Sequence, residues 1–207
     1  MKKPGLSGRE IEELSLSIVD GLLPPLALSP EERQVVMRLV HTCGDPSLSE
    51  FVVFHPGAVQ AALNALRNGC RIFSDVRMVY TGIDSSRVKA LGCEVHCALS
   101  EMKGEPGEKE TRSGAAMRYL GSRLDGSLVA IGNAPTALLS VLEMINSGIA
   151  RPAVIIGMPV GFVASKESKE ELMSRDVPYI AIRGTRGGSP LAAAAVNALL
   201  RLAIRQT

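Results

Sequence analysis

The sequence predicts an α/β protein with a doubly wound parallel β-sheet and helices on both of its faces. From residue 51 onward, short apolar runs alternate with longer helix-forming runs, which is the pattern of repeated strand–helix units. Three apolar runs in the second half end in glycine-rich turns, at 132–137, 158–162 and 183–190. In an open parallel sheet such turns lie along the carboxyl edge of the strands, where ligands bind. Three such turns follow one another, and two of them contain arginines or polar amides. This pattern predicts a site for a large anionic ligand.

Length and composition indicate one domain with a substantial core. The chain has 207 residues, of which 46% are hydrophobic. We expect a single domain over 1–207, made of an N-terminal helical segment (1–45) and an α/β core (51–207). The net charge of +2, three tyrosines, four phenylalanines and no tryptophan argue against a nucleic-acid partner.

No membrane or export signal is expected. The N-terminus has two lysines but no apolar run behind them, so it does not resemble a signal peptide. The longest apolar run, 153–164, is interrupted by glycine and proline and is shorter than the roughly 20 residues that span a bilayer. We therefore expect a cytoplasmic protein that does not contact membranes.

Two helices are expected before the alternating region. Residues 8–20 have an amphipathic pattern. The apolar residues on its stripe are Ile11, Leu14 and Ile18. Ser29 is the expected N-cap of the second helix, because a proline and two glutamates follow it directly. This helix is expected to end at His41, just before a glycine turn.

The alternation then gives the remaining elements in order. We expect strands at 51–54, 70–74, 93–99, 127–131, 153–157 and 179–182. We expect helices at 56–68, from 75, at 84–92, at 111–120, and after each of the three glycine-rich turns. The segment 100–110 is charged and contains Gly and Pro, as in loops that cover sites or stay mobile. The last helix is apolar on most faces, which predicts burial, and a second subunit is one surface that could bury it.

The four cysteines raise the question of a metal site, since His96 lies between the last two. In a strand, Cys93 and Cys97 would lie about 13 Å apart, which is too far for one ion. We interpret the cysteines as reduced and packed like small apolar residues, and we expect no bound metal.

His41 is the candidate for proton transfer among three histidines. It ends a helix, where the dipole favours the imidazolium and keeps the ring titrating near neutral pH. The alternative is that His41 only caps the last carbonyls of its helix, and spacing alone favours that cap.

Arginines at two places are candidates for anion binding. Arg112 stands at a helix start, where a cation opposes the dipole and often has an anionic partner, although a solvated arginine is an equal alternative. Arg183 and Arg186 flank a Gly-Thr pair after the last strand and, with Ser189, form a candidate anion cradle or a plain turn. The nucleotide phosphate loop, the dinucleotide fingerprint and the nucleophile elbow are absent from the sequence.

Several segments resemble the precorrin-8X methylmutase (cobalt-precorrin-8 methylmutase) family of corrin biosynthesis. The longest are LVAIGNAPTALLSVLEMI, PAVIIGMPVGFVASKESKEELM and YIAIRGTRGGSPLAAAAVNALL. With IEELS, MRLVH, SDVRMV and ETRSGAAM, the resemblance covers almost the whole chain. Leu14, where we would expect a basic residue, and Gly114, where we would expect alanine, depart from the family pattern. Neither departure removes a candidate catalytic group.

The resemblance implies a three-layer, flavodoxin-like α/β/α fold and a homodimer with active sites at or near the dimer interface. It also implies an isomerase that moves a methyl group from carbon 11 to carbon 12 of ring C in a precorrin-8 tetrapyrrole. The product would be a cobyrinic or hydrogenobyrinic acid. No cofactor is implied, although the substrate itself can carry cobalt.

The resemblance also assigns roles to individual residues. Only His41 matches the catalytic histidine of the family, which favours the proton donor and acceptor over the cap. Ser15, Arg38 and Arg112 fall on family-like positions for substrate binding, and Arg186 is a further candidate. Arg38 lies three residues before His41 on the same helical face, so both can reach one ligand.

Two other functions remain open at this stage. A corrinoid carrier without turnover would need the arginines but no proton donor. A generic flavodoxin-like nucleotide or flavin module is disfavoured by the missing phosphate loop. The sequence does not distinguish a cobalt-containing from a metal-free substrate, because both branches of the family share these motifs.

Overall fold

The computed structural model describes residues 5–205, and its centre is one six-stranded sheet in the order β1-β6-β5-β4-β2-β3. The strands are β1 (Val52–Phe54), β2 (Arg71–Ser74), β3 (Glu94–Cys97), β4 (Leu128–Ile131), β5 (Val154–Gly157) and β6 (Tyr179–Ile182). The strands β2 to β6 are all parallel, as the alternation predicts. Their order, β3-β2-β4-β5-β6, is that of flavodoxin-like sheets.

The first strand, expected at 51–54, is the exception to the parallel arrangement. It runs antiparallel to β6 at the edge, with Val52 opposite Ile182 and Phe54 opposite Ile180. This strand follows the N-terminal helices and not a strand–helix unit, so no crossover connection sets its direction. An antiparallel edge strand on a parallel sheet is common in folds of this class.

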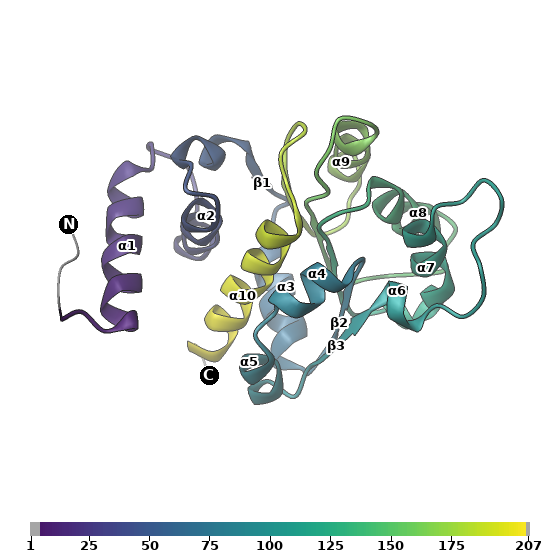
Figure 1. Ribbon diagram of the computed structural model, residues 1–207, viewed down its shortest axis with the longest axis horizontal. Helices are drawn as coiled ribbons and strands as arrows, with labels where there is room; N and C mark the ends of the chain where they lie inside the picture. Colours follow the sequence, from purple (N-terminus) through teal and green to yellow (C-terminus); the bar gives the residue numbers. More distant parts are fainter. Residues whose placement is uncertain (1–4, 206–207) are drawn as a thin grey trace.

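Helices cover both faces of the sheet, so the predicted three layers are present (Figure 1). One face carries α3 (Ala58–Arg67), α4 (Arg77–Gly82), α5 (Ser85–Ala90) and α10 (Ser189–Arg205). The other carries α6 (Ala98–Glu101), α7 (Arg112–Leu120), α8 (Pro135–Asn146) and α9 (Ser165–Met173), with the short 3₁₀ turn η2 (Gly121–Leu124) after α7. Strands β4, β5 and β6 are buried throughout, because neighbouring residues point into opposite apolar layers.

The predicted burial of the last helix is confirmed, but its own chain supplies the cover. Helix α10 packs against α2 (Pro30–Cys43), α3 and α4, and most of its apolar side chains are buried there. Helix α2 begins with the expected Ser29 cap, in which the Glu32 backbone N–H donates to the Ser29 hydroxyl. Helix α2 leads through the 3₁₀ segment η1 (Pro46–Phe51) into β1. It therefore joins the sheet domain to the outermost helix.

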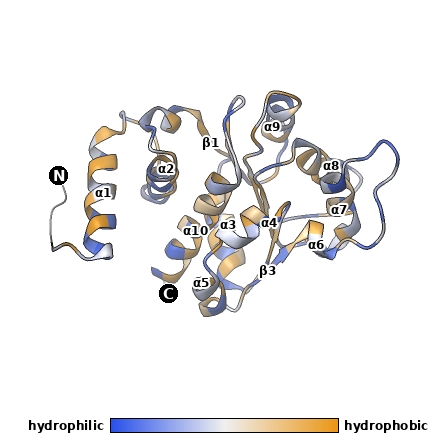
Figure 2. Ribbon diagram, in the orientation of Figure 1, coloured by the Kyte–Doolittle hydropathy of each residue, from blue (hydrophilic) through white to orange (hydrophobic). Residues whose placement is uncertain are grey.

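That outermost helix, α1 (Gly8–Leu22), packs against α2 at one end of the molecule. It is amphipathic as predicted, yet the apolar stripe noted in the sequence faces away from the chain. The exposed fractions are 55% for Ile11, 44% for Leu14, 54% for Ile18 and 57% for Leu22. Apolar residues recur along α1 at the outer edge of the molecule (Figure 2). Within residues 5–205, one apolar face of α1 is thus uncovered.

Between residues 5 and 205, no helix is both long and apolar enough to cross a bilayer. Over the same range, no group of three or more His, Cys, Asp or Glu side chains is placed to hold a metal ion. All four cysteines are free, and Cys93 and Cys97 are buried.

Candidate active site

His41 and Ser15 meet where α1 crosses the end of α2. The Ser15 hydroxyl lies 2.9 Å from Nδ1 of His41. When the hydroxyl donates to Nδ1, the hydrogen of the neutral ring resides on Nε2, the nitrogen left for a ligand. His41 is exposed, so an incoming molecule can reach it.

The capping alternative for His41 is not what the structure shows. Other groups satisfy the carbonyls at the end of α2: the Thr42 hydroxyl donates to the Arg38 carbonyl at 2.8 Å. The Gly44 N–H donates to the Val40 carbonyl, also at 2.8 Å, and Gly44 has the left-handed conformation of a helix stop. The His41 ring instead reaches across to a second helix.

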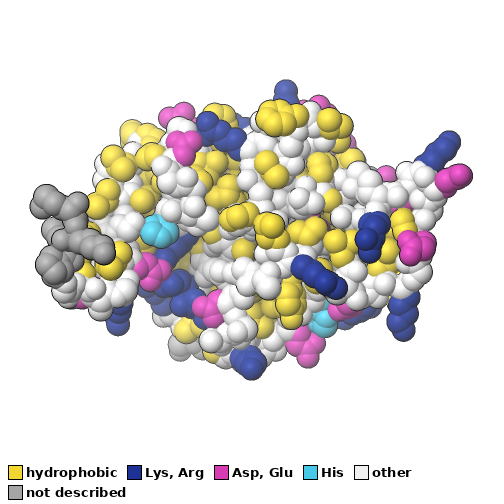
Figure 3. Space-filling view, in the orientation of Figure 1, with side chains coloured by type: hydrophobic (Ala, Val, Ile, Leu, Met, Phe, Trp, Pro, Cys, Tyr) yellow, Lys and Arg dark blue, Asp and Glu magenta, His cyan; other side chains and the backbone are white. Residues whose placement is uncertain are grey.

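A cavity of about 300 Å³ lies beside His41, between α1, α2, α10 and the start of α5. Its charged walls are three guanidinium groups and two carboxylates: Arg38, Arg87, Arg201, Glu12 and Asp84. Histidine, acidic and basic side chains gather between the N-terminal helices and the rest of the molecule in Figure 3. Arg38 therefore lines the same cavity as His41, as expected from their shared helical face.

The charges in this cavity do not balance. Glu12 accepts hydrogen bonds from both Arg38 and Arg201, and Asp84 pairs with Arg87. The Arg38 hydrogen bond lowers the pKa of Glu12, and the backbone N–H of Arg87 lowers that of Asp84. Burial, followed by the nearby Arg38 and Arg87, lowers the pKa of Arg201. Three cations thus face two anions, which suits a cavity that takes up a carboxylate.

A buried carboxylate holds the glycine-rich turn after β4. The buried carboxylate of Asp75 accepts hydrogen bonds from the backbone N–H groups of Gly132 (3.1 Å), Asn133 (2.8 Å) and Ala134 (2.9 Å). Burial raises the pKa of Asp75, and these three hydrogen bonds oppose the increase. Asp75 thus fixes the turn and does not begin α4.

The other two glycine-rich turns hold each other. The Gly161 N–H donates to the Thr185 carbonyl at 3.1 Å, and the Gly188 N–H donates to the Met158 carbonyl at 2.8 Å. Gly187 is required between them, because a Cβ at this position would lie 2.3 Å from the Met158 oxygen. Backbone hydrogen bonds therefore fix these two turns against each other.

Arg186 is held against η1 and does not reach the His41 cavity. Its guanidinium lies 3.0 Å from the Ser47 hydroxyl, 3.4 Å from the Asp45 carboxylate and 4.6 Å from the centre of the Phe51 ring. Its carbonyl accepts a 2.7 Å hydrogen bond from the amine of Lys169, whose side chain is fully buried. Burial lowers the pKa of Lys169 to about 8.

Arg112 lies at a second cavity, of about 340 Å³, shared with Arg77 and Leu99. It is the first residue of α7 and exposed. Its neighbour Thr111 caps that helix and is 2.6 Å from the Thr136 hydroxyl, so the start of α7 is tied to the start of α8. This cavity follows the carboxyl ends of β2 and β3.

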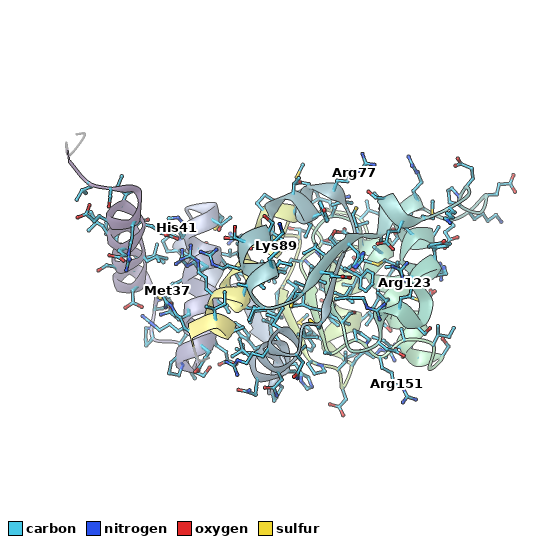
Figure 4. All side chains as sticks on the ribbon, turned by 90° about the horizontal axis from the view of Figure 1, so that it is seen from below. Met37, His41, Arg77, Lys89, Arg123 and Arg151 are labelled. Atoms are coloured by element: carbon cyan, nitrogen blue, oxygen red, sulfur yellow. The ribbon has the colours of Figure 1, made fainter. Side chains whose placement is uncertain are left out.

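The two cavities are separate within one chain. Helix α2 belongs to the apolar layer on one face of the sheet and α7 to the layer on the other. They stand toward opposite ends of the molecule in Figure 1, and Figure 4 shows His41 far from Arg77. The structure thus brings Ser15, Arg38 and His41 together and leaves Arg112 and Arg186 apart from them.

Sequence reasoning missed the acidic and basic partners that complete the His41 cavity. Glu12 could have been found, because it lies three residues before Ser15 and so shares its helical face. Arg87 and Arg201 reach the cavity from helices distant in sequence, and their participation depends on tertiary packing.

A comparison with family models identifies the family of this chain. Residues 10–202 match the family model described as CbiC, precorrin-8X methylmutase. The match includes all five candidate residues, from Ser15 to Arg186.

Individual relatives lead to the same family. The chain is 36% identical to a cobalt-precorrin-8 methylmutase of Leptospira interrogans, over 96% of each chain, and 43% identical to a precorrin-8X methylmutase of Sinorhizobium sp., over 94% of each. A crystal structure of a precorrin-8X methylmutase from Thermus thermophilus superposes with a TM-score of 0.88 at 42% identity, covering 96% of this chain and 98% of the other. This chain therefore belongs to the precorrin-8X methylmutase family, the isomerases of cobalamin biosynthesis.

Proposed function

We propose that this enzyme moves a methyl group from carbon 11 to carbon 12 of ring C in a precorrin-8-type tetrapyrrole, with His41 as proton donor and acceptor. The observation that carries the proposal is the Ser15–His41 pair at the mouth of an arginine-rich cavity. The pair supplies an oriented imidazole, and the arginines supply binding for the carboxylates of the macrocycle.

The role of His41 follows from the chemistry of the methyl shift. A 1,5-sigmatropic migration needs no nucleophile from the protein, but protonation of the ring-C nitrogen withdraws electron density from the conjugated system and so makes the carbon that receives the methyl group electron-poor. The proton must then return to the enzyme. An imidazole suits both steps, since it gives up and recovers a proton near neutral pH.

Carboxylate side chains at the rim of the substrate would bind to arginines. Arg38, with the excess positive charge around it, would hold one carboxylate close to His41, beside Ser15. Arg112 and Arg77 would hold another at the second cavity. Arg186 is a weaker candidate, since its guanidinium is already engaged with η1.

We further propose that the functional unit is a homodimer in which a second copy helps to enclose the macrocycle. The uncovered apolar face of α1 supports this, because that helix also carries Ser15. The separation of His41 from Arg112 gives further support, since the two residues line different cavities of one chain.

The proposed reaction uses no cofactor, and the substrate can contain cobalt or lack it. The shift is an isomerisation without net oxidation or reduction, so neither a nucleotide nor a redox group takes part. We expect the enzyme to act in the cytoplasm, where its four unpaired cysteines would stay reduced.

The direct test is incubation of the purified protein with precorrin-8X and, separately, with its cobalt form. Methyl migration changes the conjugation of the macrocycle, so the visible spectrum reports turnover, and mass spectrometry should show a product of unchanged mass. Turnover of one form only would assign the branch of the pathway. Binding of both forms without any spectral conversion would contradict the proposed reaction and support a corrinoid carrier.

A further inference from the structure

Glu12 connects three helices at one carboxylate oxygen. Its Oε1 accepts from Arg38 of α2 and from Arg201 of α10, the latter at 2.9 Å. The side chains are 34%, 16% and 29% exposed for Glu12, Arg38 and Arg201, so water screens the group only in part. The two guanidinium groups share this carboxylate. Its negative charge offsets their mutual repulsion and allows them to lie close together.

The effect of Glu12 extends to the catalytic pair through α1. Glu12 lies one helical turn before Ser15 and on the same face, so its ion pairs fix the part of α1 from which Ser15 reaches His41.

A second ion pair between α1 and α2 provides an internal comparison. Asp20 accepts a 2.7 Å hydrogen bond from Arg33, whose guanidinium also donates to the Asp20 carbonyl at 3.1 Å. This pair docks the same two helices but is not part of the cavity wall around His41. Loss of Asp20 therefore removes a docking interaction and leaves Arg38 untouched.

We propose that Glu12 is a positioning residue: it fixes the Arg38 guanidinium at the mouth of the His41 cavity and, through the same helix, keeps Ser15 within reach of Nδ1. The inference rests on the proposed roles of Arg38 and His41. Arg201 is the second cation on the shared oxygen and restrains Glu12 from the side of α10.

The substitution Glu12→Gln tests this most sharply, because it keeps the shape of the side chain and removes its charge. Without the carboxylate, Arg38 and Arg201 repel each other and the Arg38 guanidinium leaves its position. We expect kcat/KM for methyl migration to fall by roughly 10-fold or more, as for other small losses of catalytic alignment. Glu12→Asp, which retains the charge, should recover part of the loss. Asp20→Asn is the matched control and should stay within about twofold of the wild type.

A mutant cycle separates positioning from simple helix docking. If Glu12 acts through Arg38 and Ser15, Glu12→Gln should add less than about twofold to the loss already caused by Arg38→Ala combined with Ser15→Ala. A full additional loss in that background, or an equal loss in Asp20→Asn, overturns the proposal. Thermal unfolding of each variant identifies any effect that comes from a loss of folded protein.

The same measurements keep this inference distinct from the proposed function. His41→Ala that retains full turnover would contradict the proton-transfer role whatever Glu12→Gln does. An inactive His41→Ala together with a fully active Glu12→Gln would leave the proposed function standing and refute the role of Glu12.

Discussion

The hydroxyl of Ser15 and Nδ1 of His41 lie 2.9 Å apart although 26 residues separate them in the chain. The contact exists because α1 folds back on α2 and places Ser15 over the last turn of that helix. A hydrogen bond at Nδ1 restricts the orientation of the ring and leaves Nε2 for the substrate. Two predictions test this pair.

His41→Ala should abolish methyl migration and leave the fold and substrate binding largely intact. Loss of a general acid typically lowers the rate by about 100- to 10,000-fold. His41→Asn should be comparably slow, because an amide keeps a hydrogen bond but transfers no proton. Single-turnover kinetics, with binding followed by the substrate spectrum, checks both. Turnover within a few-fold of the wild type would contradict the role of His41.

Ser15→Ala should lower kcat by about 5-fold, since a hydrogen bond of this kind contributes on the order of 1 kcal/mol. KM should change little, because the imidazole and Arg38 remain. Ser17→Ala, at an exposed position of the same helix, is the control and should behave like the wild type. If Ser15→Ala raises KM and leaves kcat unchanged, Ser15 binds substrate and does not orient the ring.

The periodic parts of the fold were predictable, while the parts that depend on tertiary contacts were not. The parallel strands and the Ser29 cap follow from local patterns, and the structure confirms them. Tertiary packing sets the antiparallel direction of β1 and determines which side of α1 is exposed. The sequence likewise does not reveal that the Asp75 carboxylate accepts hydrogen bonds from the backbone N–H groups of Gly132, Asn133 and Ala134.

The candidate site likewise has parts that the sequence predicts and parts that depend on tertiary contacts. His41 became a candidate from its helix end and from the family resemblance, and Arg38 from the resemblance, with its spacing to His41 placing both on one helical face. The contact with Ser15 and the charges of Glu12 and Arg201 come from three helices that meet only in the folded chain.

Arg112→Ala should weaken substrate binding more than it slows the bound-state reaction. Arg112 lies at a separate cavity from His41, so its proposed partner is a carboxylate remote from ring C. A charge-assisted hydrogen bond contributes about 1.5–3 kcal/mol, or roughly 10- to 150-fold in affinity. Equilibrium titration followed by single-turnover kinetics separates the two effects. An unchanged affinity with a reduced rate would place Arg112 at the reacting ring.

Lys169 should make folding stability increase with pH above 8. Burial lowers the pKa of Lys169 from its ordinary 10.5 to about 8 in the folded chain. Between these values the unfolded chain carries the proton and the folded chain does not, so each pH unit adds at most about 1.4 kcal/mol to the free energy of unfolding. Below pH 8 the gain is absent.

Urea unfolding of the wild type and Lys169→Met between pH 7.5 and 10 checks this expectation. The stability of the wild type relative to Lys169→Met should rise across the window. Lys166→Met is the control, because Lys166 is exposed on the same helix and pairs with Glu170. A wild-type curve parallel to that of Lys169→Met would show that the buried amine does not titrate there.

The proposed homodimer should depend on the outward apolar face of α1, formed by Ile11, Leu14, Ile18 and Leu22. The last helix is covered by its own chain, whereas α1 presents bulky apolar side chains at helical spacing that no residue between 5 and 205 covers. Ile18→Glu should therefore shift sedimentation at micromolar concentration from twice 21.9 kDa toward 21.9 kDa, and turnover should fall with it. Ser17→Glu adds the same charge to a polar position of α1 and should remain dimeric. A wild-type monomer with full activity would refute the dimer, and it would require each active site to be complete within one chain.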